Sequence, residues 1–327
     1  MNTDPTLHTT PPQLGGGDLF VDVWIAAPLP NPFTYRWGCD VPPVRGQRVV
    51  VPWGRQTRIG LVQGVCDPDR GADSGSIKSV LACLDDGACL SAAWWQLIEF
   101  AARYYHHPMG MIALEALPKA LRVLNAKGAE PVMVAKARAH ALALPSDLAD
   151  QPAPPAPPAL NEGQRMALQA IEQATGFAPH LLYGITGSGK TEVYLNAVAH
   201  RLARGQQVLV LLPEINLTPA AQRLYEERLA PHRVVVLHSN LPELARTKAW
   251  YAAAMGKADV VIGTRLGVLT PLPRLGLVVV DEEHDPSYKQ QDGMRYNARD
   301  LALMLAKQRD VPVVLGSATP ALESWLK

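Results

Sequence analysis

The sequence predicts an α/β protein whose main domain is a doubly wound parallel sheet, preceded by a small, mostly β domain. From residue 160 onward, short runs of Val and Leu alternate with stretches of helical periodicity. Such runs are typical of parallel strands covered by helices on both faces. The apolar runs lie at 181–183, 208–212, 234–237, 259–262, 277–280 and 311–315. The helical stretches lie near 164–174, 191–204, 218–229, 241–255 and 298–309.

The N-terminal part predicts a separate domain. Residues 1–17 are rich in Thr, Pro and Gly, so we expect a disordered arm there. The β-type runs that follow are separated by Pro and Gly turns and lie at 19–25, 33–35, 47–52 and 57–65. A helix capped by Ser91 is expected over 92–105. We assign this small barrel or curled sheet to a domain over residues 18–118.

Between the two domains the sequence changes character. Residues 119–159 are rich in Ala and Pro, and 152–158 are dense in proline. A proline-dense segment is extended and stiff. We therefore expect a linker over 119–159 and the main domain over 160–327. A proline-binding partner could also recognise this segment.

The composition is that of an ordinary globular protein. Of the 327 residues, 48% are hydrophobic, and the formal net charge is +1. This balance excludes a strongly basic nucleic-acid tail but not a local DNA-binding patch. No apolar run is long enough to span a bilayer, and the N-terminus lacks the layout of a signal peptide, so we expect a cytoplasmic protein. The four cysteines form no C-x-x-C pair, which indicates neither zinc nor a disulfide framework in this chain.

The most specific motif is Gly-Ile-Thr-Gly-Ser-Gly-Lys-Thr over 184–191, which fits the phosphate-binding loop pattern. It follows a strand-type run and opens a helical stretch, whose dipole adds to an anion site. Lys190 would provide charge for the outer phosphates of ATP, and the hydroxyl of Thr191 would hold hydrated Mg²⁺. The alternative is a glycine-rich turn with an incidental lysine. The other loop residues expected to hold the nucleotide are Gly184, Thr186, Gly187, Ser188 and Gly189.

Further polar residues follow the strands of the main domain. Asp281 and Glu282 end the run at 277–280, where Asp281 would hold Mg²⁺ and Glu282 would orient and deprotonate the attacking water. Upstream of the loop, the amide of Gln164 could recognise adenine. Three residues near the same strand ends would relay the state of the γ-phosphate, and they are His284, Ser317 and Thr319.

A cluster of arginines and aromatics occupies the N-terminal domain. Arginines for phosphates and aromatic faces for bases are what a single-strand binding surface uses. The alternative is a solvated strand face with its aromatics in the core, which the residues by themselves favour. The residues concerned are Arg36, Arg45, Arg48, Arg55 and Arg58 with Tyr35, Trp37 and Trp53.

Taken together, these motifs resemble the PriA family of replication-restart helicases within superfamily 2. In the main domain the resemblance is carried by 184–194, 213–219, 262–265, 281–291, 295–300 and 316–323. In the N-terminal domain it is carried by 28–30, Phe33, Tyr35, 51–54, 59–60 and 104–108. The resemblance implies that residues 160–327 form a RecA-like P-loop NTPase lobe, the first of two helicase motor lobes. It implies that the N-terminal domain binds the 3′ end of the nascent leading strand.

The resemblance also implies DNA contacts. Gly263, Thr264 and Arg265, with the segment 213–215, would contact the DNA backbone. Residues 285–296 would form an aromatic-rich loop that couples DNA contact to hydrolysis. Within that loop Tyr288 and Tyr296 are kept, and Met294 stands where a tryptophan is common.

In the N-terminal domain, the residues that match the 3′-end pocket of the family are Phe33, Tyr35, Gly54 and Lys78. Thr34 stands where the family usually has Asp. Because a threonine hydroxyl cannot accept a hydrogen bond with a full negative charge, 3′-end recognition is the least secure part of the inheritance.

Two larger features depart from the family pattern. Residues 119–159 occupy the place of a winged-helix domain, which we expect to be missing or reduced to a linker. The chain stops at Lys327, before the second lobe, its arginine finger and the cysteine-rich zinc segment of the family. We expect a portion of a longer product.

The resemblance implies ATP-driven, Mg²⁺-dependent 3′-to-5′ DNA unwinding in replication restart and primosome assembly at stalled forks. The implied partners are forked or single-stranded DNA with a 3′ end, single-strand binding protein and primosome proteins, with no membrane. Because unwinding needs two lobes that close on ATP, we expect this chain alone to bind Mg·ATP and DNA weakly and to unwind nothing. The competing interpretation is a non-enzymatic DNA-binding or scaffold protein with a vestigial ATP site.

Overall fold

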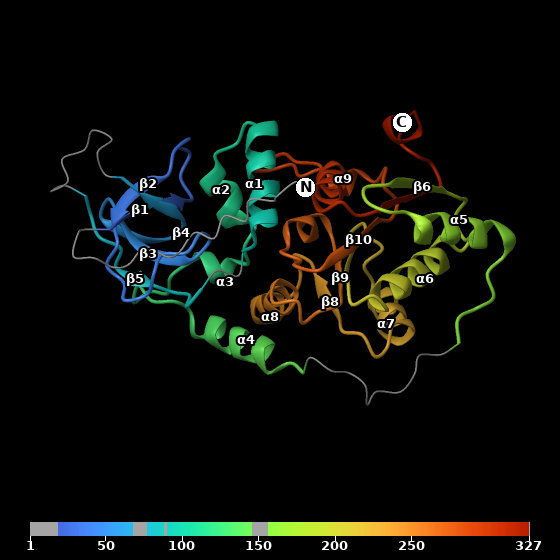
Figure 1. Ribbon diagram of the computed structural model, residues 1–327, viewed down its shortest axis with the longest axis horizontal. Coiled ribbons are helices and arrows are strands. Elements are labelled where there is room, and N and C mark those ends of the chain that lie inside the picture. The colour runs from blue at the N-terminus through green and yellow to red at the C-terminus, as the bar shows by residue number, and fades with distance from the viewer. Residues whose placement is uncertain (1–18, 68–76, 88–89, 146–155, 327) are drawn as a thin grey trace, which may run out of the picture. The chain divides into compact units, whose positions relative to one another are not determined.

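The computed structural model describes residues 19–67, 77–87, 90–145 and 156–326. The chain divides into two compact units, one of residues 1–25 with 31–88 and the other of residues 26–30 with 89–327. Figure 1 shows the order of the elements along the chain. The expected disordered arm and most of the proline-dense segment lie outside the described residues. Within the described residues no helix is long and apolar enough to cross a membrane.

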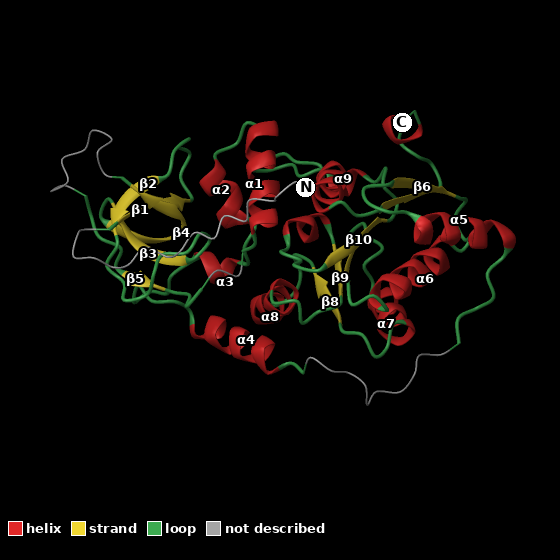
Figure 2. Ribbon diagram, in the orientation of Figure 1, coloured by secondary structure: helices red, strands yellow, loops and turns green. Residues whose placement is uncertain are grey.

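The first unit is an antiparallel sheet with the order β2-β1-β4-β3-β5 (Figure 2). Its strands are β1 (Phe20–Ile25), β2 (Phe33–Arg36), β3 (Arg48–Trp53), β4 (Gln56–Cys66) and β5 (Ala82–Cys83). Alternate side chains such as Val21, Val23 and Val49 face a common core, as a sheet with one packed face requires. The curled β domain expected from the sequence is therefore confirmed.

Part of the arginine and aromatic cluster belongs to this core. Tyr35 and Trp37 are 4% and 8% exposed and pack against the valines. Arg48 is also buried, with its guanidinium at 2.9 and 2.7 Å from the carboxylate oxygens of Asp85. The interpretation of a solvated strand face with its aromatics in the core therefore holds for Tyr35 and Trp37, and Arg48 is removed from the candidate DNA surface.

The Arg48–Asp85 pair yields a prediction of local stability. Asp85→Ala leaves a buried guanidinium without this carboxylate, which costs about 3–5 kcal/mol in comparable buried pairs. We expect faster amide hydrogen exchange in β3 and β4 of the full chain, measured by mass spectrometry.

The control is Glu162→Ala, which removes an exposed ion pair with Arg165 worth about 0–1 kcal/mol. Replacing both buried partners, by Arg48→Met with Asp85→Leu, should restore most of the protection. Unchanged exchange in Asp85→Ala would show that the pair does not hold this unit together.

The second unit contains a six-stranded, fully parallel sheet with the order β6-β11-β10-β7-β9-β8. Its strands are β6 (Pro179–Tyr183), β7 (Gln207–Leu211), β8 (Val234–Leu237), β9 (Val260–Gly263), β10 (Leu275–Val280) and β11 (Val313–Ser317). Every residue of β7, β9, β10 and β11 is buried, as expected for strands covered on both faces. The doubly wound sheet is confirmed.

Helices cover this sheet. Those within the second half are α5 (Glu162–Gln173), α6 (Lys190–Leu202), α7 (Pro219–Arg228), α8 (Glu243–Ala254), α9 (Ala298–Arg309) and α10 (Leu322–Trp325), with the 3₁₀ turns η2 (Arg265–Leu269) and η3 (Pro286–Tyr288). Residues from α5, α6 and α7 share one core cluster with the strands, as Ile171, Val198 and Tyr225 do. The helix α9 packs against β10 and β11.

The segment from residue 90 to 145 also belongs to the second unit. It forms α1 (Ala92–Tyr104), α2 (Met109–Glu115), α3 (Lys119–Arg122) and α4 (Val132–Ala143). Val134, Ala137 and Ala141 of α4 are buried, and α4 packs on α8. Within residues 119–143, part of the expected linker, the chain therefore forms two helices that belong to this unit. Alanine is the best helix former, and its small side chain lets α4 lie close to α8.

Candidate functional site

The loop between β6 and α6 has the backbone that a phosphate site needs. Gly187 and Gly189 have φ of +80° and +81°, a conformation that side chains with a Cβ rarely adopt. Gly189 is the N-cap of α6, so the first N–H groups of this helix open toward the loop. The N–H of Gly184 donates to the carbonyl of Ser317 at 3.1 Å, which fixes the loop to the end of β11.

Lys190 lies where the loop joins the helix. Its Nζ donates to the carbonyl of Gly184 at 2.8 Å and lies 3.6 Å from Oε1 of Glu282. The side chain of Lys190 is only 9% exposed. A buried charge held by one carbonyl and one carboxylate can exchange these partners for phosphate oxygens.

The two carboxylates expected at the end of β10 follow it directly. Asp281 accepts a hydrogen bond from the hydroxyl of Tyr194 at 3.0 Å. Burial raises the pKa of Asp281, while the Tyr194 hydrogen bond and the charge of Lys190 lower it. Glu282 has φ of +42°, which costs a side chain with a Cβ about 1–3 kcal/mol. This strained turn brings the Glu282 carboxylate to Lys190.

The ends of β10 and β11 are joined by side chains. Nδ1 of His284 lies 2.7 Å from Oγ of Ser317, and Nε2 lies 3.2 Å from Oγ1 of Thr319. His284 Nδ1 is also 3.8 Å from Glu282. The structure thus brings the three residues expected to relay the nucleotide state into contact, and it connects them to the acidic pair.

Gln164 lies against the phosphate loop. It forms a capping box with Asn161, and its Nε2 donates to the carbonyls of Ser188 at 3.0 Å and Gly189 at 3.4 Å. Its Oε1 accepts from the N–H of Asn161 at 2.9 Å. The amide therefore supports the loop backbone in this structure, and its contact with adenine stays a prediction.

Two residues of the site were missed by sequence reasoning. Tyr194 is 1% exposed and looked like an ordinary core residue of α6, yet its hydroxyl reaches Asp281. Glu283 has a fully buried carboxylate that accepts from Arg299, from the N–H of Ala321 and from the hydroxyl of Ser324. Only the run of three acids at 281–283 could have indicated Glu283.

The residues expected to contact DNA in this unit are mostly internal. Tyr288 is 1% exposed and donates to the carbonyls of Leu211 and Asp281, and Tyr296 is 3% exposed and donates to that of Arg265. Both side chains are therefore buried in this structure, with their hydroxyls on backbone carbonyls, and contact of these rings with DNA stays a prediction. Thr264 is also buried, and the half-buried Arg265 donates to the carbonyl of Ser287 at 3.2 Å.

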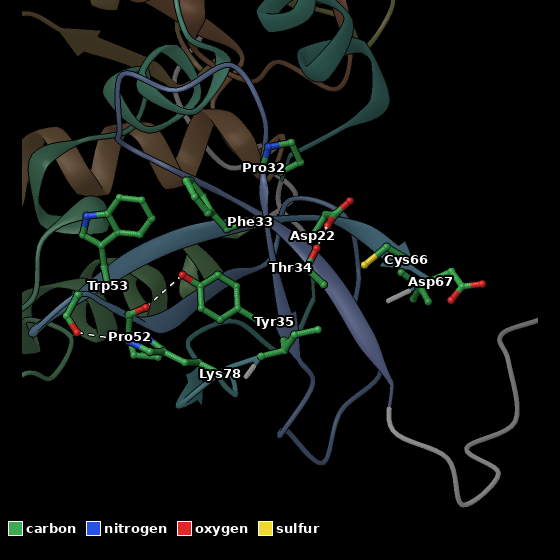
Figure 3. A pocket seen from close by; sticks show the side chains of 13 residues that line it. Asp22, Pro32, Phe33, Thr34, Tyr35, Pro52, Trp53, Cys66, Asp67 and Lys78 are labelled. Carbon is green, nitrogen blue, oxygen red and sulfur yellow. Dashed lines mark hydrogen bonds between the residues drawn. The ribbon is translucent and has the colours of Figure 1, made fainter. Parts of the chain in front are cut away.

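The first unit contains a pocket of about 670 Å³ (Figure 3). This volume is within the range of small-molecule sites, about 300–1,000 Å³. All four residues expected at the 3′-end site line it, namely Phe33, Tyr35, Gly54 and Lys78. Phe33 packs edge-on against Trp53, with ring centroids 4.5 Å apart.

The polar groups of the pocket are held by its own backbone. The hydroxyl of Tyr35 donates to the carbonyl of Pro52 at 3.1 Å, and burial raises the pKa of Tyr35 to about 12, so the phenol stays neutral. Nζ of Lys78 lies 3.4 Å from the carbonyl of Gly54. Thr34 donates to Oδ1 of Asp22 at 2.8 Å. Asp22 is a pocket residue that the sequence did not indicate.

Two family models match the chain. Residues 161–325 match the model of the DEAD/DEAH box helicase, and the chain belongs to this family. Residues 22–118 match the PriA 3′DNA-binding domain (3′BD). The chain is similar to the N-terminal portion of curated proteins named replication restart protein PriA, and the resemblance to that helicase family is confirmed.

Three curated relatives named replication restart protein PriA illustrate this match. The protein from Haemophilus influenzae is 34% identical over 93% of this chain and 50% of its own length. The protein from Treponema pallidum is 34% identical over 91% of this chain and 43% of its own length. The protein from Synechocystis is 46% identical over 51% of this chain and 20% of its own length. The chain thus spans half or less of the length of these relatives.

The partly buried Asp281 yields a prediction. The pKa of Asp281 in the folded state is raised above the ordinary value of an aspartate, so ionisation of Asp281 destabilises the fold. This cost reaches its full size at pH values above the folded-state pKa. Asp281→Asn should therefore raise the thermal midpoint at neutral pH, by about 2–4 °C for each kcal/mol relieved. As the pH falls through the folded-state pKa, the difference from the wild type should shrink, and it should vanish below the ordinary pKa of an aspartate.

Calorimetry of the nucleotide-free chain over a pH series measures this difference. Asp292→Asn, at an exposed carboxylate, is the matched control and should leave the midpoint nearly unchanged. A lower midpoint for Asp281→Asn at neutral pH would mean that the carboxylate stabilises the fold.

Proposed function

We propose that this chain is the N-terminal portion of an ATP-dependent 3′-to-5′ DNA helicase that acts in replication restart and primosome assembly at stalled forks. The observation that carries the proposal is the meeting of Lys190 with Glu282 at 3.6 Å, beside the partly buried Asp281, at the carboxyl edge of a parallel sheet. Ligands in such sheets bind at this edge. The match to a DEAD/DEAH box helicase supports the same chemistry.

The oxygen donors at this edge suit Mg²⁺ with a nucleotide. No group of three His, Cys, Asp or Glu side chains in the described part of the chain could hold a metal by itself. Mg²⁺ prefers one or two protein oxygens together with phosphates and water. Asp281 and Thr191 would supply these oxygens, and the ion would neutralise charge on the transferred phosphoryl group.

Each side chain then has one task. Lys190 exchanges the Gly184 carbonyl for phosphate oxygens, and the loop N–H groups bind the same phosphates. Glu282 orients the attacking water and accepts its proton. His284 changes its contacts with Ser317 and Thr319 when the γ-phosphate leaves, because it lies between them and Glu282.

We assign Mg·ATP binding and DNA binding to this chain and unwinding to the whole protein. The pocket of the first unit binds the 3′ end of a DNA strand, with Phe33 and Trp53 as apolar walls for the terminal base. Single-strand binding protein and primosome proteins are the partners, and the compartment is the cytoplasm. This part of the proposal rests on the relatives, which are replication restart proteins.

The proposal predicts the effect of removing the lysine. Lys190→Ala removes a charge-assisted contact worth about 1.5–3 kcal/mol, so Mg·ATP affinity should fall about tenfold to a hundredfold. Equilibrium binding of a fluorescent ATP analogue to the chain measures this change. Glu282→Gln should bind ATP nearly as well as the wild type, since its role is in hydrolysis.

The matched control is Lys307→Ala on the exposed side of α9, which should leave the affinity unchanged. The same variants in the longer protein should lose ATPase activity stimulated by single-stranded DNA. If wild type and Lys190→Ala bind ATP equally poorly and the longer protein lacks this ATPase, the chain is a DNA-binding protein with a vestigial nucleotide site.

A further inference from the structure

A row of three residues crosses the sheet at the end pocket. Asp22 of β1 pairs with Thr34 of β2 on one side and with Gly64 of β4 on the other. The strand register shifts between Asp22 and Val23, so a β-bulge lies at this position in the β1–β4 pair. Bulges re-aim side chains and are frequent beside binding sites.

The neighbours of Asp22 leave space around its carboxylate. A Cβ placed on Gly64 would meet nothing within 4 Å, so the β4 side is open. On the β2 side stands the short side chain of Thr34, and Figure 3 shows Asp22 and Thr34 meeting at one part of the pocket. Among the described residues, the Asp22 carboxylate accepts one side-chain hydrogen bond, which comes from the hydroxyl of Thr34. The carboxylate therefore keeps acceptor capacity that a ligand can use.

The hydrogen-bond direction decides which of the two residues is the stronger acceptor. An ionised carboxylate only accepts, so the single hydroxyl proton of Thr34 is donated to Asp22. Thr34 retains only neutral lone pairs for a ligand. A hydroxyl donor binds a carboxylate about twice as strongly as a neutral oxygen.

The charges of the pocket favour a neutral ligand group at this point. Its lining includes two carboxylates, those of Asp22 and Asp67, and one ammonium, that of Lys78. Lys78 lies against Gly54, at the part of the lining formed by the β3–β4 turn. A terminal phosphate placed at Asp22 would meet like charge, whereas a hydroxyl would find an acceptor.

We infer that Asp22 is the residue that selects the chemical form of the DNA end: its carboxylate accepts a hydrogen bond from a 3′-hydroxyl and repels a 3′-phosphate, and Thr34 positions it. This inference rests on the proposed function of the pocket as a 3′-end site. Asp22 provides the negative charge that Thr34 lacks, and it does so from the neighbouring strand. Thr34 then does not weaken recognition of the 3′ end. Asp22 of β1 is the charged acceptor, and Thr34 of β2 holds it in position.

The test compares three single-stranded DNAs of one sequence with the full chain: a linear strand with a 3′-hydroxyl, a linear strand with a 3′-phosphate, and a circle without ends. Fluorescence anisotropy competition gives the three affinities. The wild type should prefer the 3′-hydroxyl strand to the 3′-phosphate strand by about tenfold or more, the value of one charge-assisted hydrogen bond. Asp22→Asn keeps the shape and removes the charge, so this ratio should fall close to one.

Two further variants sharpen the comparison. Asp67→Asn removes the other lining carboxylate and should keep the preference of the wild type. The exchange Asp22→Thr with Thr34→Asp moves the carboxylate to the neighbouring strand. This variant should also keep the preference for the 3′-hydroxyl strand. Thermal unfolding followed by circular dichroism verifies that each variant is folded.

The outcomes separate the inference from the function beneath it. If the wild type prefers the 3′-hydroxyl and Asp22→Asn keeps the full preference, the role of Asp22 is wrong and the end site stands. If Asp67→Asn loses the preference as completely as Asp22→Asn, general negative charge and not Asp22 selects the end. If the wild type binds all three DNAs equally, the 3′-end site itself is wrong, and the inference falls with it.

Discussion

The strands β6, β11 and β10 end side by side, and the proposed nucleotide site depends on this adjacency. The middle strand, β11, accepts a hydrogen bond from Gly184 of the phosphate loop through the carbonyl of Ser317, and one from the N–H of Glu283 through that of Gly316. The loop and the acidic segment are therefore each fixed by one of two consecutive carbonyls of β11. Space is tight there as well, since a Cβ on Gly316 would lie 1.5 Å from the hydroxyl oxygen of Tyr194. A glycine is required between the two halves of the site.

The site is maintained at a cost to the fold. Burial raises the pKa of Asp281, and Glu282 occupies a strained backbone conformation at φ +42°. A dense set of contacts nearby offsets these costs. Glu283 accepts hydrogen bonds from Arg299 and from two further donors. The hydroxyl of Tyr288 binds the carbonyls of Asp281 and Leu211. Tyr288 and Arg265 connect this set to the end of β9 through Ser287. The residues that resemble DNA contacts in sequence are thus partly the internal supports of the acidic pair.

The sequence predicted what depends on local chemistry. The phosphate loop, the carboxylates after β10 and the hydroxyls at the end of β11 were all predicted, because glycine spacing and strand-end polarity can be recognised in a single segment. The partners Tyr194 and Glu283 were not, because strand order decides what a buried side chain reaches. The same holds for Asp22, whose neighbour Thr34 is set by the register of β1 and β2. The helix α4 was missed because an alanine-rich sequence next to prolines resembles a linker. Only the packing of this segment on α8 distinguishes a helix from a linker.

The central claim is that 184–191 and the Asp281–Glu282 pair form one half of an ATP site. A crystal structure of this chain with Mg²⁺ and a non-hydrolysable ATP analogue tests it most directly. We expect the phosphates at the N–H groups of the loop, the Lys190 ammonium moved from the Gly184 carbonyl to phosphate oxygens, and the ion between Thr191, Asp281 and the nucleotide. Nucleotide bound away from this edge, or Lys190 still on the Gly184 carbonyl beside bound phosphates, would contradict the account.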